Sequence, residues 1–224
     1  MTGSEISQKI NLINQEIPAN VELIAVTKQV GIESMRAAYA AGIRNFAENR
    51  LQEALTKQQQ LQDLLDVNWH FIGHIQKNKA KKVIENFDWI HSVDSLPLAQ
   101  RLNRLSGELD LRPKVLLQVK VVPDPNKYGW DVASLLADLE ELNHCGQLNF
   151  QGLMTILPLG LSSAEALAAF QATQELAVLI KGKNYANVTM KELSMGMSGD
   201  YKLAVEAGST QIRLGRIIFG EREN

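Results

Sequence analysis

The chain has 224 residues, of which 45% are hydrophobic and 21% charged, a composition typical of a globular protein long enough for one large core. Its formal net charge of −2 argues against a nucleic-acid partner or an anionic membrane surface. Because Cys145 is the single cysteine, an internal disulfide is excluded. The sequence has neither the apolar core of a signal peptide nor an apolar run long enough to span a membrane, so we expect a cytoplasmic protein without a membrane partner.

A helix over Glu5–Ile17 and a buried strand over Val21–Thr27 are the first predicted elements. Lys28 follows the strand directly, although an unpartnered ammonium is costly to bury. Taken alone, a lysine in this position is more often solvated at a strand end. The functional alternative is an amine whose pKa partial burial lowers, so that it attacks an aldehyde.

The rest of the chain alternates short apolar runs with amphipathic stretches. The further strands are predicted at Asn45–Asn49, Trp69–Gly73, Asp88–Asp94, Lys114–Val122, Phe150–Ile156, Lys191–Gly196 and Gln211–Gly220. Helical patterns between them include Ile32–Ile43, Asn78–Phe87, Ser95–Ser106, Val132–Cys145, Ser163–Ile180 and Asp200–Gly208. Eight strands alternating with helices predict a (β/α)8 TIM barrel, with a doubly wound open sheet as the alternative. Since no linker-like segment interrupts the chain, we expect one domain over residues 1–224.

Active sites of such barrels lie at the carboxyl ends of the strands, and phosphates often bind after the seventh and eighth. The segment Glu192–Asp200, ELSMGMSGD, follows the seventh strand and carries the Ser194 and Ser198 hydroxyls. It suits a phosphate, although capping of the next helix by Ser198 or Asp200 explains it equally simply.

Arg213 lies in the middle of the eighth predicted strand and points either inward, where it needs a partner, or outward toward a helix carboxylate. Gly215 and the Arg216 amide follow at about 7–10 Å along a strand. That spacing is close to the distance between the ring nitrogen and the phosphate of a pyridine cofactor.

Three weaker signals accompany these segments. Asn49 ends the second strand and either reaches the barrel mouth or caps a helix. His70 and His74 are four residues apart, a spacing that brings two metal ligands together on a helix. Here His70 lies on a predicted strand and His74 follows it, so no metal site is expected. Asp94 is the best-placed carboxylate for a sugar-phosphate isomerase on a similar barrel.

Several longer motifs occur in order over nearly the whole chain. They are AVTK (Ala25–Lys28), FAENRLQEA (Phe46–Ala54), WHFIGHIQKNKAK (Trp69–Lys81), HSVDSLPLAQRLN (His91–Asn103), GLMTI (Gly152–Ile156) and LSMGMSGDYKLAVEAGSTQIRLGRIIFG (Leu193–Gly220). In these motifs the chain resembles the YggS/PROSC (PLPBP) family of pyridoxal phosphate homeostasis proteins. The resemblance implies a barrel of the alanine racemase N-terminal-domain type, the fold type III of pyridoxal phosphate proteins, with an extra N-terminal helix.

The resemblance also implies a cofactor and the residues that hold it. Pyridoxal 5′-phosphate (PLP) is expected as an internal aldimine on Lys28, with Arg213 facing the pyridine nitrogen and Asn49 near the face of the ring. The phosphate is expected on Ser198, the Met197 backbone, and the Gly215 and Arg216 amides. FAEN stands where the family commonly has a glycine before the Glu-Asn pair, which affects none of these contacts.

The implied function is intracellular PLP (vitamin B6) homeostasis: holding the cofactor and buffering it or delivering it to apo PLP-dependent enzymes, without substantial catalysis. The alternative is a PLP-dependent amino-acid racemase, which needs acid/base groups on both faces of the bound substrate. Alanine racemases take their second base, a tyrosine, from a separate C-terminal domain. In this chain, which ends with FGEREN, we do not expect such a domain. Tyr128 is the one tyrosine expected near the mouth, and the protein is expected to be a monomer.

Overall fold

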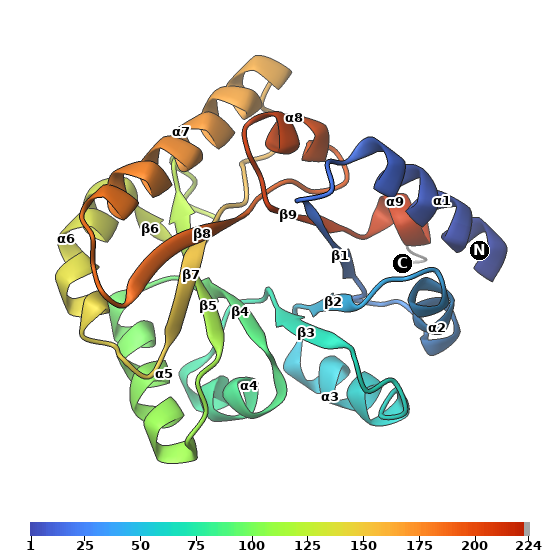
Figure 1. Cartoon of the computed structure of the whole chain (residues 1–224), viewed down its shortest axis with the longest axis horizontal. Coiled ribbons are helices and arrows are strands. Elements are labelled where there is room, and N and C mark those ends of the chain that lie inside the picture. Colours follow the sequence, from blue (N-terminus) through green and yellow to red (C-terminus); the bar gives the residue numbers. More distant parts are fainter. Residues whose placement is uncertain (222–224) are drawn as a thin grey trace.

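Eight parallel strands close into a barrel in the computed structural model, which describes residues 1–221 (Figure 1). Neighbours pair around the ring in the order β4-β3-β2-β1-β9-β8-β7-β5, and the pairing of β4 with β5 closes it. The strands are β1 (Glu22–Val26), β2 (Asn45–Glu48), β3 (Asn68–Phe71), β4 (Trp89–Val93), β5 (Lys114–Lys120), β7 (Asn149–Met154), β8 (Val188–Ser194) and β9 (Gln211–Leu214). The closing pair excludes the open-sheet alternative.

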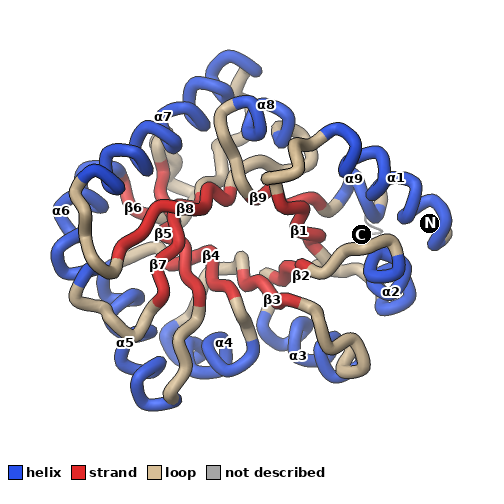
Figure 2. Tube along the Cα trace, in the orientation of Figure 1, coloured by secondary structure: helices blue, strands red, loops and turns tan. Residues whose placement is uncertain are grey.

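Helices form an outer layer around the ring of strands (Figure 2). The connecting helices are α2 (Ile32–Ala40), α3 (Leu51–Gln60), α4 (Ala80–Asn86), α5 (Leu96–Leu109), α6 (Val132–Asn143), α7 (Ser163–Gly182) and α8 (Tyr201–Glu206). The expected N-terminal helix is α1 (Gly3–Glu16), which begins with a capping box between Thr2 and Glu5. Within residues 1–221, no helix combines the length and apolar character needed to cross a membrane.

Three short elements were not expected. The 3-10 helix η1 (Lys77–Lys79) precedes α4, and β6 (Trp130–Asp131) pairs with β5 outside the ring. The predicted strand Gln211–Gly220 is wrong beyond Leu214, because α9 (Arg216–Phe219) replaces its second half. A short apolar run such as Ile-Ile-Phe has no periodicity that separates strand from helix. Here α9 packs beside α1 (Figure 1), and Ile218 is fully buried in the same apolar cluster as Ile6.

The interior of the ring is partly apolar and partly polar. One small cluster consists of Ile24, Val26 and Ala47, and another of Trp89, Leu116 and Met154; neither contains a helix residue, which puts both inside the ring. The larger clusters join strands to the surrounding helices. The remaining inner positions carry buried polar side chains, each of which needs a hydrogen-bond partner.

Candidate functional site

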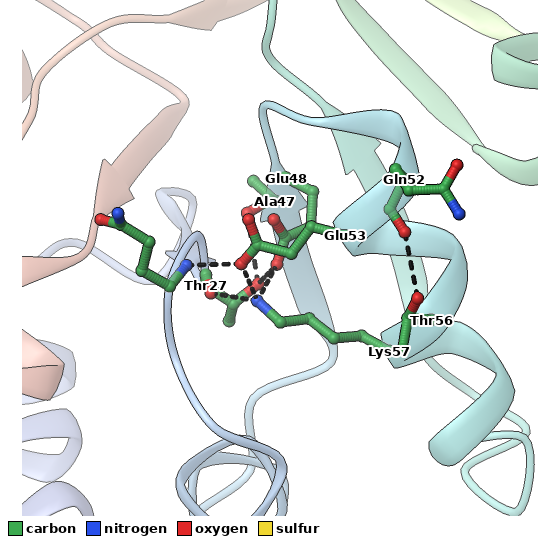
Figure 3. A network of polar contacts seen from close by, with 8 residues as sticks. Thr27, Ala47, Glu48, Gln52, Glu53, Thr56 and Lys57 are labelled. Atoms are coloured by element: carbon green, nitrogen blue, oxygen red, sulfur yellow. Dashed lines mark hydrogen bonds and ion pairs between the residues drawn. The ribbon is translucent and has the colours of Figure 1, made fainter.

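Lys28 is half-buried in the turn after β1, at the carboxyl end of the ring. Its two chain neighbours are anchored to the elements that follow (Figure 3). Thr27 Oγ1 donates to Glu48 Oε1 at 2.6 Å, and the Gln29 amide donates to Glu53 Oε1 at 2.5 Å. Gln29 has a φ of 60°, so the turn includes a left-handed residue that is not glycine. The lysine therefore projects from a fixed turn rather than from a frayed strand end.

Asn49 lies beside this turn, at the end of β2. Val26 is paired with Ala47, so Lys28 and Asn49 are both two residues beyond paired positions on adjacent strands. A cavity of about 100 Å³ is lined by both residues. Asn49 Oδ1 is buried and has no hydrogen-bond partner within residues 1–221. Arg50, not Asn49, is the N-cap residue of α3, so helix capping does not account for the asparagine.

Arg213 points into the barrel from β9, the strand on the other side of β1. It is paired with Ile24 and is 3% exposed. Its Nη1 donates to Ser194 Oγ at 2.6 Å and its Nη2 to the Thr155 carbonyl at 2.8 Å. Burial lowers the pKa of Arg213 to about 10, which still leaves a full positive charge at neutral pH. The outward orientation toward a helix carboxylate is wrong.

Arg213 begins a hydrogen-bonded chain that crosses the interior of the barrel. Its members come from six different strands: Arg213, Ser194, His91, His70, Asn45 and Glu22. The distances that follow the arginine contact are 2.8 Å from Ser194 to His91, 2.9 Å between the histidines, 3.2 Å from His70 to Asn45, and 2.8 Å from Asn45 to Glu22. A cation and a carboxyl group thus terminate one continuous chain.

The ends of the chain fix its direction. The guanidinium can only donate, so Ser194 Oγ accepts from it and donates its own proton to His91 Nδ1. His91 Nε2 then donates to His70 Nδ1, and His70 Nε2 donates to Asn45 Oδ1. Both imidazoles are neutral, because burial lowers the pKa of His70 to about 3 and lowers that of His91 well below its usual value.

The turns after β8 and β9 meet beside the β1 turn, on the side away from β2. Ser198 Oγ accepts a hydrogen bond from the Ile217 amide at 3.4 Å, and both residues line a cavity of about 610 Å³ together with Arg216. A second cavity of about 400 Å³ is lined by Gln29, Gly215 and Arg216, which links this region to the Lys28 turn. The Met197 amide donates to Asp200 Oδ1 at 2.6 Å.

Gly196 makes the turn after β8 feasible. Its φ is 95°, and a Cβ there would lie 2.7 Å from Ala204 Cβ. The Asp200 side chain accepts a hydrogen bond from the Met197 amide and does not cap α8. The glycine and the aspartate thus shape the turn on which Ser198 lies.

Loops after β3, β4 and β5 bring a further group together. His74 Nδ1 lies 3.0 Å from Asp94 Oδ2, and the His74 ring stacks on Tyr128 with their centroids 3.6 Å apart. Tyr128 therefore lies on the mouth side, as expected. His70 and His74 do not converge on a metal, and residues 1–221 contain no cluster of three or more potential histidine, cysteine or carboxylate ligands.

Comparison with known proteins decides the family. Residues 3–223 match the family described as the alanine racemase N-terminal domain. A pyridoxal phosphate homeostasis protein from Synechocystis sp. is 52% identical over 206 residues, which are 92% of this chain and 94% of that protein. The chain belongs to the pyridoxal phosphate homeostasis protein family.

Other members of the pyridoxal phosphate homeostasis family agree. The Escherichia coli K12 protein of that name is 35% identical over 92% of this chain and 88% of its own length. PipY of Synechococcus elongatus, whose structure has been solved with PLP bound, is 47% identical with a TM-score of 0.92 over 96% of this chain and 100% of that chain. An alanine racemase of Clostridium difficile 630 shares the fold, with 15% identity and a TM-score of 0.78 over 99% of this chain and 58% of that chain.

The side chains present fit a pyridine cofactor of the kind that PipY holds. Lys28 and Asn49 line the same small cavity, and within residues 1–221 the amide oxygen of Asn49 has no hydrogen-bond partner. A buried cation, Arg213, lies on the adjoining strand. The sequence had singled out Lys28, Asn49 and Arg213. It had not connected Arg213 to His91 and His70. The signal for these histidines was only that each lies within a short, largely apolar strand, in WHF and WIHSV.

Proposed function

We propose that this chain binds PLP at the carboxyl ends of β1, β2, β8 and β9 and acts in PLP homeostasis. The observation that carries the proposal is the grouping of Lys28, Asn49 and Arg213 on three adjoining strands. PipY, which is 47% identical, has been solved with PLP, and the homeostasis proteins named above support the same assignment.

Lys28 is the proposed point of covalent attachment. Bound PLP supplies an aldehyde, to whose carbon a primary amine bonds while the aldehyde oxygen leaves as water. The Lys28 turn holds such an amine beside the cavity that also contains Asn49 Oδ1, an acceptor for a donor group on the ligand. Arg213 lies on β9, the strand that pairs with β1 on the side away from β2.

Arg213 is proposed to face the pyridine nitrogen. A guanidinium held by Ser194 and Thr155 donates hydrogen bonds but cannot accept one, so it keeps the nitrogen facing it unprotonated. An unprotonated ring withdraws electrons only weakly. The main support for proposing a carrier and not an enzyme is the similarity to the homeostasis proteins named above.

The phosphate is proposed to bind Ser198, the Gly215 and Arg216 amides, and the Met197 backbone. The turns after β8 and β9 lie against each other through Ser198 and Ile217, so one anion can reach both. The Met197 amide already donates a hydrogen bond to Asp200. It can contact the phosphate only if the same N–H is shared between the Asp200 carboxylate and the phosphate. Ser198 and the β9 turn are therefore the stronger part of the proposed seat.

We further propose that the protein is a cytoplasmic monomer that buffers PLP or delivers it to apo enzymes. Its exposed large apolar side chains are spread over α1, α7 and separate loops instead of forming one face on a single element.

Racemisation of an amino acid at ordinary enzyme turnover would contradict the carrier assignment.

The decisive experiment is titration of the purified protein with PLP, followed by borohydride reduction and peptide mapping. We expect a new absorption band and a reduced adduct on Lys28 in the wild type, and no adduct in Lys28→Ala. A wild-type protein that forms no adduct, or an adduct that persists in Lys28→Ala, would contradict the proposal. Transfer of bound PLP to an apo enzyme faster than its free release would support the delivery role.

A further inference from the structure

A second lysine, Lys57 on α3, is buried behind the Lys28 turn (Figure 3). Its side chain is 9% exposed, and its Nζ contacts three acceptors. The distances are 2.6 Å to the Thr27 carbonyl, 2.8 Å to Glu48 Oε1 and 2.6 Å to Glu53 Oε1. An ammonium has three N–H donors, so all three are used by this arrangement.

The same two carboxylates reach the Lys28 turn. Glu48 Oε1 accepts from the Thr27 hydroxyl, and Glu53 Oε1 accepts from the Gln29 amide. Lys57 itself binds the Thr27 carbonyl. The peptide units before and after Lys28 are thus tied to a single buried ammonium and its carboxylates. We call Glu48, Glu53 and Lys57 the turn clasp.

The turn clasp is a costly way to pack this position. Burial raises the pKa of Glu48, and Glu48 Oε2 has no hydrogen-bond partner in the part of the chain that the structure describes. Burial acts in the same direction on Glu53, but hydrogen bonds from Lys57 and the Gln29 amide lower its pKa overall. Because apolar residues of similar volume often stabilise a core as well as a buried ion pair does, stability alone does not explain the clasp.

The backbone of the turn supplies a reason. Gln29 has a φ of 60°, a conformation that side-chain-bearing residues adopt rarely and keep only when their surroundings hold them there. Its amide is the group that Glu53 binds. Without that contact, the turn can relax and turn the Lys28 side chain away from the site.

We propose that the turn clasp is a positioning device for Lys28, which sets how tightly the cofactor aldehyde is held. The inference rests on the proposed attachment of PLP to Lys28. Glu48 and Lys57 act through the backbone of residues 27–29. Glu53 acts through the Gln29 amide and also lines the cavity beside Lys28, so the test must separate positioning of Lys28 from direct contact with the cofactor. The turn clasp governs the covalent part of the affinity, whereas the phosphate turns govern the non-covalent part.

Glu53 is the residue on which to test this, because it is half-buried and its replacement leaves the Lys57–Glu48 pair in place. The variants are Glu53→Ala, which removes the acceptor, and Glu53→Gln, which keeps an oxygen for the Gln29 amide. Thr56→Ala is the matched control, because Thr56 lies on the same helix and its hydroxyl donates to the Gln52 carbonyl, away from the Lys28 turn (Figure 3). The probes are PLP and 4′-deoxypyridoxine 5′-phosphate, which has a methyl group in place of the aldehyde.

In Glu53→Ala we expect the dissociation constant for PLP to rise about tenfold, because a hydrogen bond to a charged group is lost. Binding of the deoxy compound should change by less than about twofold, and Glu53→Gln should recover most of the PLP affinity. In the cofactor-free protein, hydrogen exchange of the Gln29 amide should be faster in Glu53→Ala than in Thr56→Ala. Exchange does not depend on the cofactor, so it tests the clasp separately.

Two results would overturn the proposal. One is an unchanged Gln29 exchange rate in Glu53→Ala, and the other is an equal loss of affinity for PLP and the deoxy compound. Failure of the wild-type protein to form an adduct on Lys28 would instead overturn the proposed function. The melting temperature of each variant shows whether its fold is retained.

Discussion

At the scale of single residues, Arg213 determines the polarity of the barrel interior. Its charge orients the hydroxyl of Ser194, and that hydroxyl fixes the tautomers of two buried histidines as far as Glu22. A neutral residue at position 213 removes the fixed donor at this end, whereas the Asn45 amide still donates to Glu22 and holds the His70 tautomer at the other end. The effect of a substitution here should therefore reach both the cofactor and the interior of the barrel.

Arg213→Gln should weaken retention of PLP by about tenfold, because a charge-assisted hydrogen bond becomes a neutral one. The pyridine nitrogen also becomes able to take up a proton, so the pH dependence of the absorption band should change. Titration by absorbance between pH 6 and 9 measures both effects. Arg112→Gln, an exposed arginine, is the control. Unchanged binding and spectrum would place Arg213 outside the site.

At the scale of elements, strands β7 and β8 leave no room for a side chain at Gly152. A Cβ on that glycine would lie 1.8 Å from the Glu192 carbonyl oxygen, a backbone atom that cannot move alone. The pairing of β7 shifts register beside this glycine, toward both β5 and β8. Gly152 thus permits the register shift after which Met154 pairs with Ser194 at the carboxyl end of β8.

Gly152→Ala should lower the free energy of unfolding by about 3 kcal/mol or more, because the two strands must separate to admit a methyl group. Urea unfolding followed by circular dichroism measures this. Gly146→Ala is the control, since a Cβ there meets nothing within 4 Å. Equal stability of the two variants would show that the β7–β8 contact is not tight.

At the scale of the whole molecule, the buried histidines link the stability of the barrel to pH. His70 and His91 are neutral when folded, because burial lowers their pKa, whereas unfolded histidines titrate near pH 6.5. The unfolded chain therefore binds more protons below about pH 6.5, and stability falls as the pH falls. Burial raises the pKa of Glu22 and Glu48, which acts in the opposite direction.

The contribution of one histidine can be isolated with a variant. Between about pH 6 and 4, each buried neutral histidine should reduce the free energy of unfolding by up to about 1.4 kcal/mol per pH unit. His70→Gln should lower this slope by about that amount, and replacement of the exposed His144 by Gln should not. The measurement is urea unfolding at several pH values. Equal slopes in all three proteins would mean that His70 is not neutral in the folded state.

The sequence predicted most of the fold from local patterns. Apolar runs of strand length alternate with helical periodicity eight times, and parallel strands joined by helices have few ways to close. The prediction failed at Arg216–Phe219, where an apolar run forms α9 and not a strand. Residues packing from α1 decide that conformation, and they lie more than 200 positions earlier in the chain.

The sequence alone determined the barrel, the N-terminal helix and a set of candidate residues at the ends of strands, because periodicity and motifs are local properties of the chain. Only the tertiary structure decided what touches Lys28 and Arg213. The turn clasp contacts Thr27 and Gln29, which lie about 20 to 30 positions before it in the sequence. The hydrogen-bonded chain from Arg213 to Glu22 joins six strands. Such contacts depend on the register of paired strands and on which side chains face inward, and closure of the ring fixes both.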